Sequence, residues 1–243
     1  MTDLNRRGAF AALSKVVAGV LLASCATTRA EIVYSNFQTP LDYYVGAFGP
    51  YEEIADDLFL DGTSRILQSV SVAYAAFDIP ADAKPTMTLS IYAMNGESNA
   101  KTQNVISPGD LLFQQSICIV NSDGQLVTFT DNTGTVYLPD HVAVGLSFTG
   151  IGYGDPQLPD AGPLLLDPPT VGGSFPDFWI KGLDGDGPGW GLYDYSDANG
   201  SPIPANFAIQ INAVPETGTL WNLLSIPVLF AVGSVINRRR ASR

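Results

Sequence analysis

The sequence predicts an all-β protein, an antiparallel sandwich of two sheets and of jelly-roll type. Large apolar residues alternate with Ser, Thr or Gln in residues 67–74 and 86–91, and this period of two is typical of strands with one buried face. Turn sequences such as Asn95-Gly96 separate the alternating segments. No helical spacing of apolar residues interrupts them. The 243 residues, with 24 Gly and 17 Pro, therefore fit one loop-rich domain better than two.

The expected strands follow one another along the middle of the chain. They are residues 32–37, 58–60, 67–74, 86–91, 111–120, 125–130, 135–138, 142–149, 178–180, 191–195 and 207–213. Residues 151–176 break this rhythm with Gly, Pro and Asp. We expect either a long ordered loop or a flexible flap there.

Composition and charge exclude several classes of protein. The hydrophobic fraction of 46% excludes a disordered acidic tail, and two Cys exclude a disulfide scaffold. Residues 31–213 contain four basic and 22 acidic residues, a net charge of −18. Nucleic acid and anionic lipid would repel this domain, so we expect no nucleic-acid partner.

Residues 1–30 have the features of a signal peptide. Arg6 and Arg7 precede an apolar stretch, and the small residues Thr28 and Ala30 occupy the positions that signal peptidase reads. Cleavage after Ala30 would leave a mature domain of residues 31–213.

Two other N-terminal signals remain open. Residues 22–25 resemble the lipobox of bacterial lipoproteins, in which Cys25 would be acylated. The pair Arg6-Arg7 resembles a twin-arginine signal, so the export route is open as well. A buried N-terminal helix is the remaining alternative.

The C-terminal segment, residues 214–243, has three parts in a fixed order. A short motif is followed by the apolar residues 220–236 and then by a basic cluster. A helix over the apolar stretch would be about 25 Å long, a short membrane span whose cytoplasmic end the arginines would hold. The motif is Val214, Pro215, Glu216, Thr217 and Gly218, and the basic cluster is Arg238, Arg239 and Arg240.

This tail resembles the PEP-CTERM sorting signal that exosortases process in Gram-negative bacteria that make exopolysaccharide. Pro215 and Glu216 match the family motif, whereas Thr217 stands where a second Pro is usual. The motif is also similar to the Leu-Pro-x-Thr-Gly signal of Gram-positive sortases, with Val214 in place of Leu. Both resemblances imply cleavage near the motif by an exosortase-like or sortase-like protease. A plain C-terminal membrane anchor is the alternative.

The mature span offers few groups for catalysis or zinc binding. His141 is the only His, and it precedes an expected strand without a Gly-x-Ser-x-Gly motif, which favours a surface histidine over a catalytic base. Cys118 alternates with Leu112 and Val120, which favours a core position. A glycosidase would need its acidic residues on one strand, whereas those of this chain cluster in turns. We therefore expect no enzyme activity and no cofactor, with calcium as the possible exception.

Acidic residues on Gly-rich turns near residue 185 predict a calcium site. Their carboxylate oxygens are the ligands that calcium prefers, although Asp and Gly also form ordinary turns. A weaker second cluster comprises Asp56, Asp57 and Asp61. The candidate ligands are Asp184, Asp186, Asp194 and Asp197.

Four aromatic residues near these turns predict a glycan-binding face. Flat rings beside acidic acceptors are typical of sugar sites, but aromatic residues in strands are more often part of a core. The residues are Trp179, Trp190, Tyr193 and Tyr195.

These observations together predict an exported bacterial protein of the cell envelope, the outer surface or the extracellular matrix. It would be held briefly in the inner membrane by its C-terminal helix before processing. Its role would be structural or glycan-binding, with exopolysaccharide as a candidate partner. A sortase-anchored cell-wall protein and a polysaccharide-degrading enzyme are the alternatives.

Overall fold

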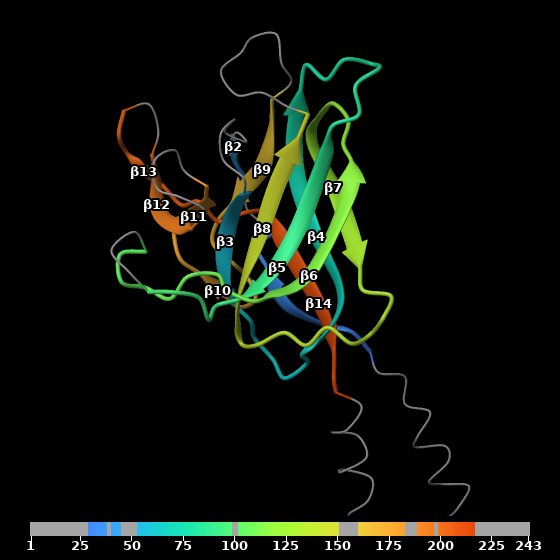
Figure 1. Cartoon of the computed structure of the whole chain (residues 1–243), viewed down its shortest axis with the longest axis vertical. Helices are drawn as coiled ribbons and strands as arrows, with labels where there is room; N and C mark the ends of the chain where they lie inside the picture. The colour runs from blue at the N-terminus through green and yellow to red at the C-terminus, as the bar shows by residue number, and fades with distance from the viewer. Residues whose placement is uncertain are drawn as a thin grey trace, which may run out of the picture. The chain divides into compact units, whose positions relative to one another are not determined.

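The structure is a computed structural model, and in it the alternating segments form strands. The structure describes residues 29–37, 40–44, 53–98, 102–150, 160–182, 189–196 and 199–216. These residues form two antiparallel sheets and contain no helix (Figure 1). Accordingly, none of the described segments is a helix long and apolar enough to cross a membrane. The prediction of an all-β, two-sheet protein is confirmed.

The strands lie in one compact unit, Ala30–Val214. This unit contains all the described strands and both apolar clusters, so it has the separate core that an independently folding domain requires. The strands are β1 (Glu31–Ser35), β2 (Pro40–Tyr44), β3 (Glu53–Phe59), β4 (Ile66–Phe77), β5 (Thr86–Ala93), β6 (Leu111–Cys118), β7 (Ser122–Thr130), β8 (His141–Thr149), β9 (Asp160–Leu166), β10 (Gly173–Ser174), β11 (Asp177–Lys181), β12 (Trp190–Ser196), β13 (Pro202–Ile203) and β14 (Ile209–Val214).

Strands β2 to β9 pair like the two arms of one long folded hairpin. β5 pairs with β6, β4 with β7, β3 with β8 and β2 with β9. The pairs alternate between sheets, because β2, β4, β7 and β9 belong to the six-stranded sheet and β3, β5, β6 and β8 to the eight-stranded sheet. The chain therefore changes sheet at every connection of this region except the one from β5 to β6.

The other strands extend both sheets. The six-stranded sheet has the order β1-β14-β4-β9-β2, with β7 on the other edge of β4. The eight-stranded sheet has the order β13-β12-β11-β3-β8-β5-β6, with β10 also paired to β3. Residues 178–180 and 191–195, expected as strands, are thus an extension beside β3.

The core lies between the two sheets, where the inward-facing residues of each strand meet. In β4, Val70, Val72 and Tyr74 are buried, and Leu89 and Ile91 of β5 belong to the same cluster. Burying side chains of this size contributes about 1.5–3 kcal/mol each. The period of two in residues 67–74 and 86–91 was therefore a correct indication of strands.

The Gly- and Pro-rich stretch was predicted incorrectly. In the part of this stretch that the structure describes, residues 160–176, the chain is not one long loop or flap, because β9 lies there and pairs with both β4 and β2. Leu165 and Leu166 of β9 are buried, so apolar burial outweighs the poor strand propensity of Gly162 and Pro163. Residues 135–138 form only an isolated bridge, Ile66 with Tyr137.

Cys118 is not a core residue, contrary to the sequence-based expectation. It is an exposed free cysteine. The sequence argument chose the wrong face of β6. The odd-numbered residues Phe113, Gln115 and Ile117 lie on the core side of the strand, because they lie opposite the buried Ile91, Leu89 and Met87 of β5. The even-numbered residues from 114 onward therefore face solvent. Val120, assigned to the same buried face, is exposed as well.

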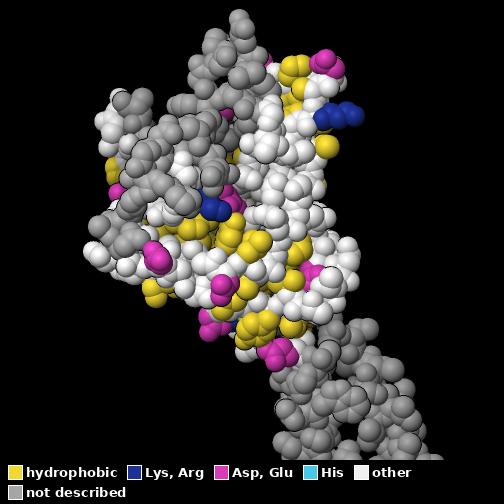
Figure 2. Space-filling view, in the orientation of Figure 1, with side chains coloured by type: hydrophobic (Ala, Val, Ile, Leu, Met, Phe, Trp, Pro, Cys, Tyr) yellow, Lys and Arg dark blue, Asp and Glu magenta, His cyan; other side chains and the backbone are white. Residues whose placement is uncertain are grey.

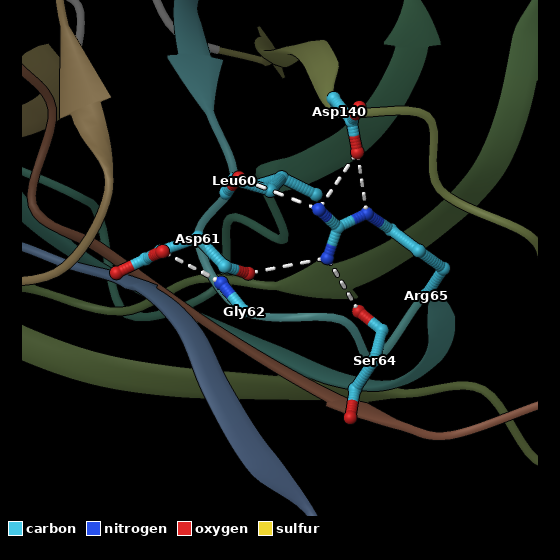
Figure 3. A network of polar contacts seen from close by, with 6 residues as sticks. All are labelled: Leu60, Asp61, Gly62, Ser64, Arg65 and Asp140. Atoms are coloured by element: carbon cyan, nitrogen blue, oxygen red, sulfur yellow. Dashed lines mark hydrogen bonds and ion pairs between the residues drawn. The ribbon is translucent and has the colours of Figure 1, made fainter.

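Arg65 forms hydrogen bonds both within the turn after β3 and to the segment that precedes β8 (Figure 3). Its Nε and Nη2 donate to Asp140 Oδ1 over 2.9 and 2.7 Å, and its Nη1 donates to the carbonyl oxygens of Asp61 and Ser64. The Arg65 side chain is 9% exposed, whereas that of Asp140 is 87% exposed. The guanidinium therefore acts mainly by satisfying carbonyl groups in the turn.

Replacing Arg65 with Met should lower the free energy of unfolding by about 2–3 kcal/mol, because buried carbonyl oxygens lose their donor. Asp140→Asn should cost less than about 1 kcal/mol, because the carboxylate is solvated. Urea unfolding of both variants measures the difference. Equal losses would contradict the assignment of the stabilisation to the carbonyl contacts.

Candidate functional site

The candidate site lies on the outer face of the eight-stranded sheet, away from the core. Strand β3 supplies its centre, since residues that alternate with the core residues Ile54 and Leu58 face outward. Around Ala55 lies a second apolar cluster, which we call the outer cluster. It consists of Ala55, Tyr92, Ala143 and Trp179, with Met94, Trp190 and Leu192 packed against it.

A buried carboxylate borders the outer cluster. Glu53 accepts a hydrogen bond of 2.7 Å from the Tyr92 hydroxyl group, and Lys181 Nζ lies 3.8 Å from the same carboxylate oxygen. Burial and this carboxylate raise the pKa of Tyr92 to about 12. Lys181 also lies 5.6 Å from the centre of the Trp190 ring, so one cation contacts both groups. A Cβ atom on Gly145 would collide with the Glu53 carboxylate, which explains the glycine at this position of β8.

Three aspartates form a row across β3, β11 and β12, which we call the acidic row. Asp177 pairs with Asp194, and the register that pairs Trp179 with Ala55 places Asp177 opposite Asp57 when it is extended by two residues. Asp57 is 1% exposed. Its Oδ2 lies 3.3 Å from His141 Nε2, and its Oδ1 has no hydrogen-bond partner among the described residues.

The acidic row changes the titration of Asp177. Burial, the charge of Asp57 and, more weakly, that of Asp194 raise the pKa of Asp177 to about 6. A carboxyl group whose pKa is raised to about 6 beside a second carboxylate can serve acid–base chemistry. It can also be the consequence of packing acids on one face.

On the opposite face of β3, Asp56 enters the interior between the sheets. Its Oδ2 accepts a hydrogen bond of 2.8 Å from the backbone N–H of Phe207, and its Oδ1 lies 2.9 Å from the Ser174 hydroxyl. The same hydroxyl lies 2.8 Å from Asn206 Oδ1, and Asn206 donates to Asp167 over 2.6 Å. Burial and then the charge of Asp57 raise the pKa of Asp56 well above its usual range.

This polar network fits a protonated Asp56. The Ser174 hydroxyl has one proton but lies between two acceptor oxygens, on Asp56 and Asn206. If Ser174 donates to Asn206, a proton on Asp56 completes the second hydrogen bond. The network is therefore satisfied when the buried carboxyl group is neutral.

His141, expected as a surface histidine directly before a strand, is instead the first residue of β8, and its side chain is only 29% exposed. Its ring stacks on Phe59 at 4.1 Å, and Phe59 meets Phe175 edge to face at 5.3 Å. Figure 2 shows acidic side chains scattered among hydrophobic ones over the lower part of the described surface. His141 lies beside one buried carboxylate, but no described hydroxyl or thiol is placed against it to complete a nucleophilic triad.

The four candidate glycan-binding residues do not form one platform. Trp179 is 0% exposed, and with Trp190 it belongs to the outer cluster. Tyr193 and Tyr195 lie on the other face of β12 and pack against the main core, beside Phe178. Alternation along β12 therefore separates rings that are close in sequence.

Most of the expected calcium ligands lie outside the described residues. This applies to Asp184, Asp186 and Asp197, whereas Asp194 is exposed at the end of the acidic row. Within the described segments, no group of three or more His, Cys, Asp or Glu side chains is arranged to hold a metal ion. The second cluster is also divided, because Asp56 and Asp57 face opposite sides of β3.

The terminal signals lie largely outside the described residues as well. This holds for residues 1–28 with Cys25, for Thr217 and Gly218, for the apolar residues 220–236 and for the arginines 238–240. Val214 ends β14, and Pro215 and Glu216 follow it without regular structure.

Sequence reasoning missed the acids of β3. They were expected in turns, but Glu53, Asp56 and Asp57 belong to one strand and are buried. The available signal was the run Glu53–Phe59, in which acids interrupt apolar residues directly before the expected strand at residues 58–60. Comparison with family models, curated proteins and solved structures finds no match to this chain.

The acidic row predicts a pH-dependent stability. Because the native pKa of Asp177 lies above the unfolded value of 3.8, the native state binds more protons between pH 3.8 and about 6, and the free energy of unfolding falls as pH rises through this interval. Asp177→Asn removes this loss. The variant should gain on the order of 1 kcal/mol over the wild type at about pH 7.5, and less at about pH 4.

Urea unfolding at both pH values measures this gain. Asp82→Asn, at an exposed turn acid, is the control for a general loss of negative charge. A gain for Asp177→Asn that is the same at both pH values would refute the role of the acidic row.

Proposed function

We propose that this chain is an exported bacterial β-sandwich with a non-catalytic, structural role at the outer surface or in the extracellular matrix. The observation that carries this proposal is the extent of the compact unit, Ala30–Val214. It begins at the expected signal-peptidase site and ends at the first residue of the sorting motif. Cleavage at both sites would leave every described strand in place.

The pairing of the first and last strands supports the same proposal. β1 pairs with β14, and Glu31 lies opposite Ala213. Each terminal strand is therefore held by a ladder of backbone hydrogen bonds up to the expected cleavage site. Removal of the segments beyond these strands would break none of these bonds.

We further propose that the sandwich is of jelly-roll type. The support is the nested pairing of β2 to β9, in which one long antiparallel hairpin alternates between two sheets. Eight strands with this alternation are what a jelly roll requires.

The geometry of the acids and rings supports a role without catalysis. Asp57 is buried, so a polymer substrate would not reach the carboxylate that lies beside Asp177. A glycan-binding role would depend on Trp190 alone, because Trp179 is buried and the two tyrosines face the core. These positions favour a structural role over both a degradative enzyme and a sugar-binding face.

The proposed processing follows from the terminal sequences. Signal peptidase would remove residues 1–30, and an exosortase-like protease would act near Pro215 to Gly218 after a brief stay in the inner membrane. A sortase-like protease is the alternative. Exopolysaccharide is the proposed surrounding polymer, and the net charge of −18 would keep the domain soluble within it.

Intact-mass analysis of the protein from its native host should find a chain that starts near Glu31 and lacks the residues after about Gly218. Glu216→Ala in the motif should leave the C-terminal segment attached, whereas Glu97→Ala, an exposed acid outside the motif, should be processed normally. A native protein that ends at Arg243 would overturn the proposal.

A further inference from the structure

The free edge of β6 is unusual among the edges of the two sheets. No described residue pairs with the edge of β6 that faces away from β5, and Figure 1 draws no strand beyond β6 and β7 on their side of the molecule. A free edge presents unpaired N–H and C=O groups, and proteins normally protect it with charges, proline or short length.

Other described edges carry such protection. β1 contains Glu31, and β7 contains Asp123. β13 and β10 have two residues each. β6 has eight residues, Leu-Leu-Phe-Gln-Gln-Ser-Ile-Cys, with neither a charge nor a proline.

We propose that β6 is an interface at which two copies of this chain pair edge to edge, antiparallel, with Gln115 on the two-fold axis. The proposal goes beyond the structural role above and does not depend on export or processing. An antiparallel pair of identical strands has two-fold symmetry, so each residue meets the one equally far from the centre on the other copy.

The chemistry of β6 is symmetric about Gln115. One position away on either side are the polar residues Gln114 and Ser116, and two positions away are the apolar residues Phe113 and Ile117. In this register, Phe113 of one copy lies opposite Ile117 of the second copy, and Gln114 opposite Ser116. Apolar and polar residues therefore meet their own kind along the seam.

The burial of these residues supports the same register. Phe113 and Ile117 are only partly buried and pack against the main core. Gln115 lies between them, opposite the buried Leu89, but is itself exposed. A second copy would complete the cover of both apolar residues and join the two eight-stranded sheets.

Charge favours a second copy at this edge over other parts of the surface. The domain is strongly acidic, so copies repel one another where acids meet. β6 lacks acids altogether, and it thus provides a line of contact at which two copies approach without placing carboxylates opposite one another.

The oligomeric state of the Ala30–Val214 unit tests the proposal. Sedimentation equilibrium from roughly 1 to 100 μM should show a monomer–dimer equilibrium. Gln115→Lys would place two like charges opposite each other at the axis, so the dissociation constant should rise at least about tenfold. Asn132→Lys, the same charge change at an exposed turn, should leave it unchanged. A wild type that is monomeric throughout, or equal effects of the two variants, would overturn the proposal.

A cross-linking experiment tests the register independently. Cys118→Ser removes the only cysteine of the unit, and Gln115→Cys then places two thiols opposite each other on the axis. Directly opposed residues have Cα atoms about 4.5–5.5 Å apart, within the range that a disulfide spans. The control Gln114→Cys meets its own copy offset by two residues, roughly 7 Å along the strand.

Mild oxidation should therefore cross-link Gln115→Cys at least about tenfold faster than Gln114→Cys, at equal concentration and with the same far-ultraviolet circular dichroism. Equal rates, or faster reaction of Gln114→Cys, would overturn the paired register.

Discussion

Burying Asp56 between the sheets constrains one end of the sandwich. An unpaired carboxyl group in an apolar interior costs several kcal/mol, so both of its oxygens must find hydrogen-bond partners on other elements. The N–H of Phe207 donates to one oxygen, and the hydroxyl of Ser174 lies 2.9 Å from the other, which carries the proton in the neutral network described above. Asn36 adds a second set of contacts nearby, donating to the carbonyl oxygens of Leu166 and Phe207 and accepting from the N–H of Ile209. The ends of β1 and β9, the start of β14 and the short strand β10 are positioned together.

β3 also places an acidic residue, Asp57, on the outer face of the sheet. Asp57 follows Asp56 and faces the opposite side of β3, so one pair of adjacent carboxyl groups links the interior with the acidic row. Burial and then the charge of Asp57 raise the pKa of both Asp56 and Asp177, and a protonated acid has no charge to desolvate. The raised pKa of Asp177, about 6, thus follows from its burial and from the position of Asp57 beside it.

The sequence predicted those parts of the fold whose burial follows from a single strand. β4, β5 and β8 show the period of two because one face of each packs in the core. β9 was missed because its burial depends on β4 and β2, which lie far away in sequence. The exposure of Cys118 depends on which face of β6 meets the second sheet, and periodicity alone gives either answer. The division of Trp190 from Tyr193 could have been predicted from alternation, whereas the acidic row required the pairing of three strands.

The central claim is that Asp56 acts as a hydrogen-bond acceptor that the interior requires. Its most direct test compares Asp56→Asn with Asp56→Leu by urea unfolding at neutral pH. The amide retains an oxygen for the Phe207 N–H, whereas Leu leaves that buried donor unpaired. The account predicts that the Leu variant is less stable than the Asn variant by at least about 2 kcal/mol. Apolar replacements of buried charged groups can also be neutral or stabilising, and a Leu variant as stable as the Asn variant would contradict the account.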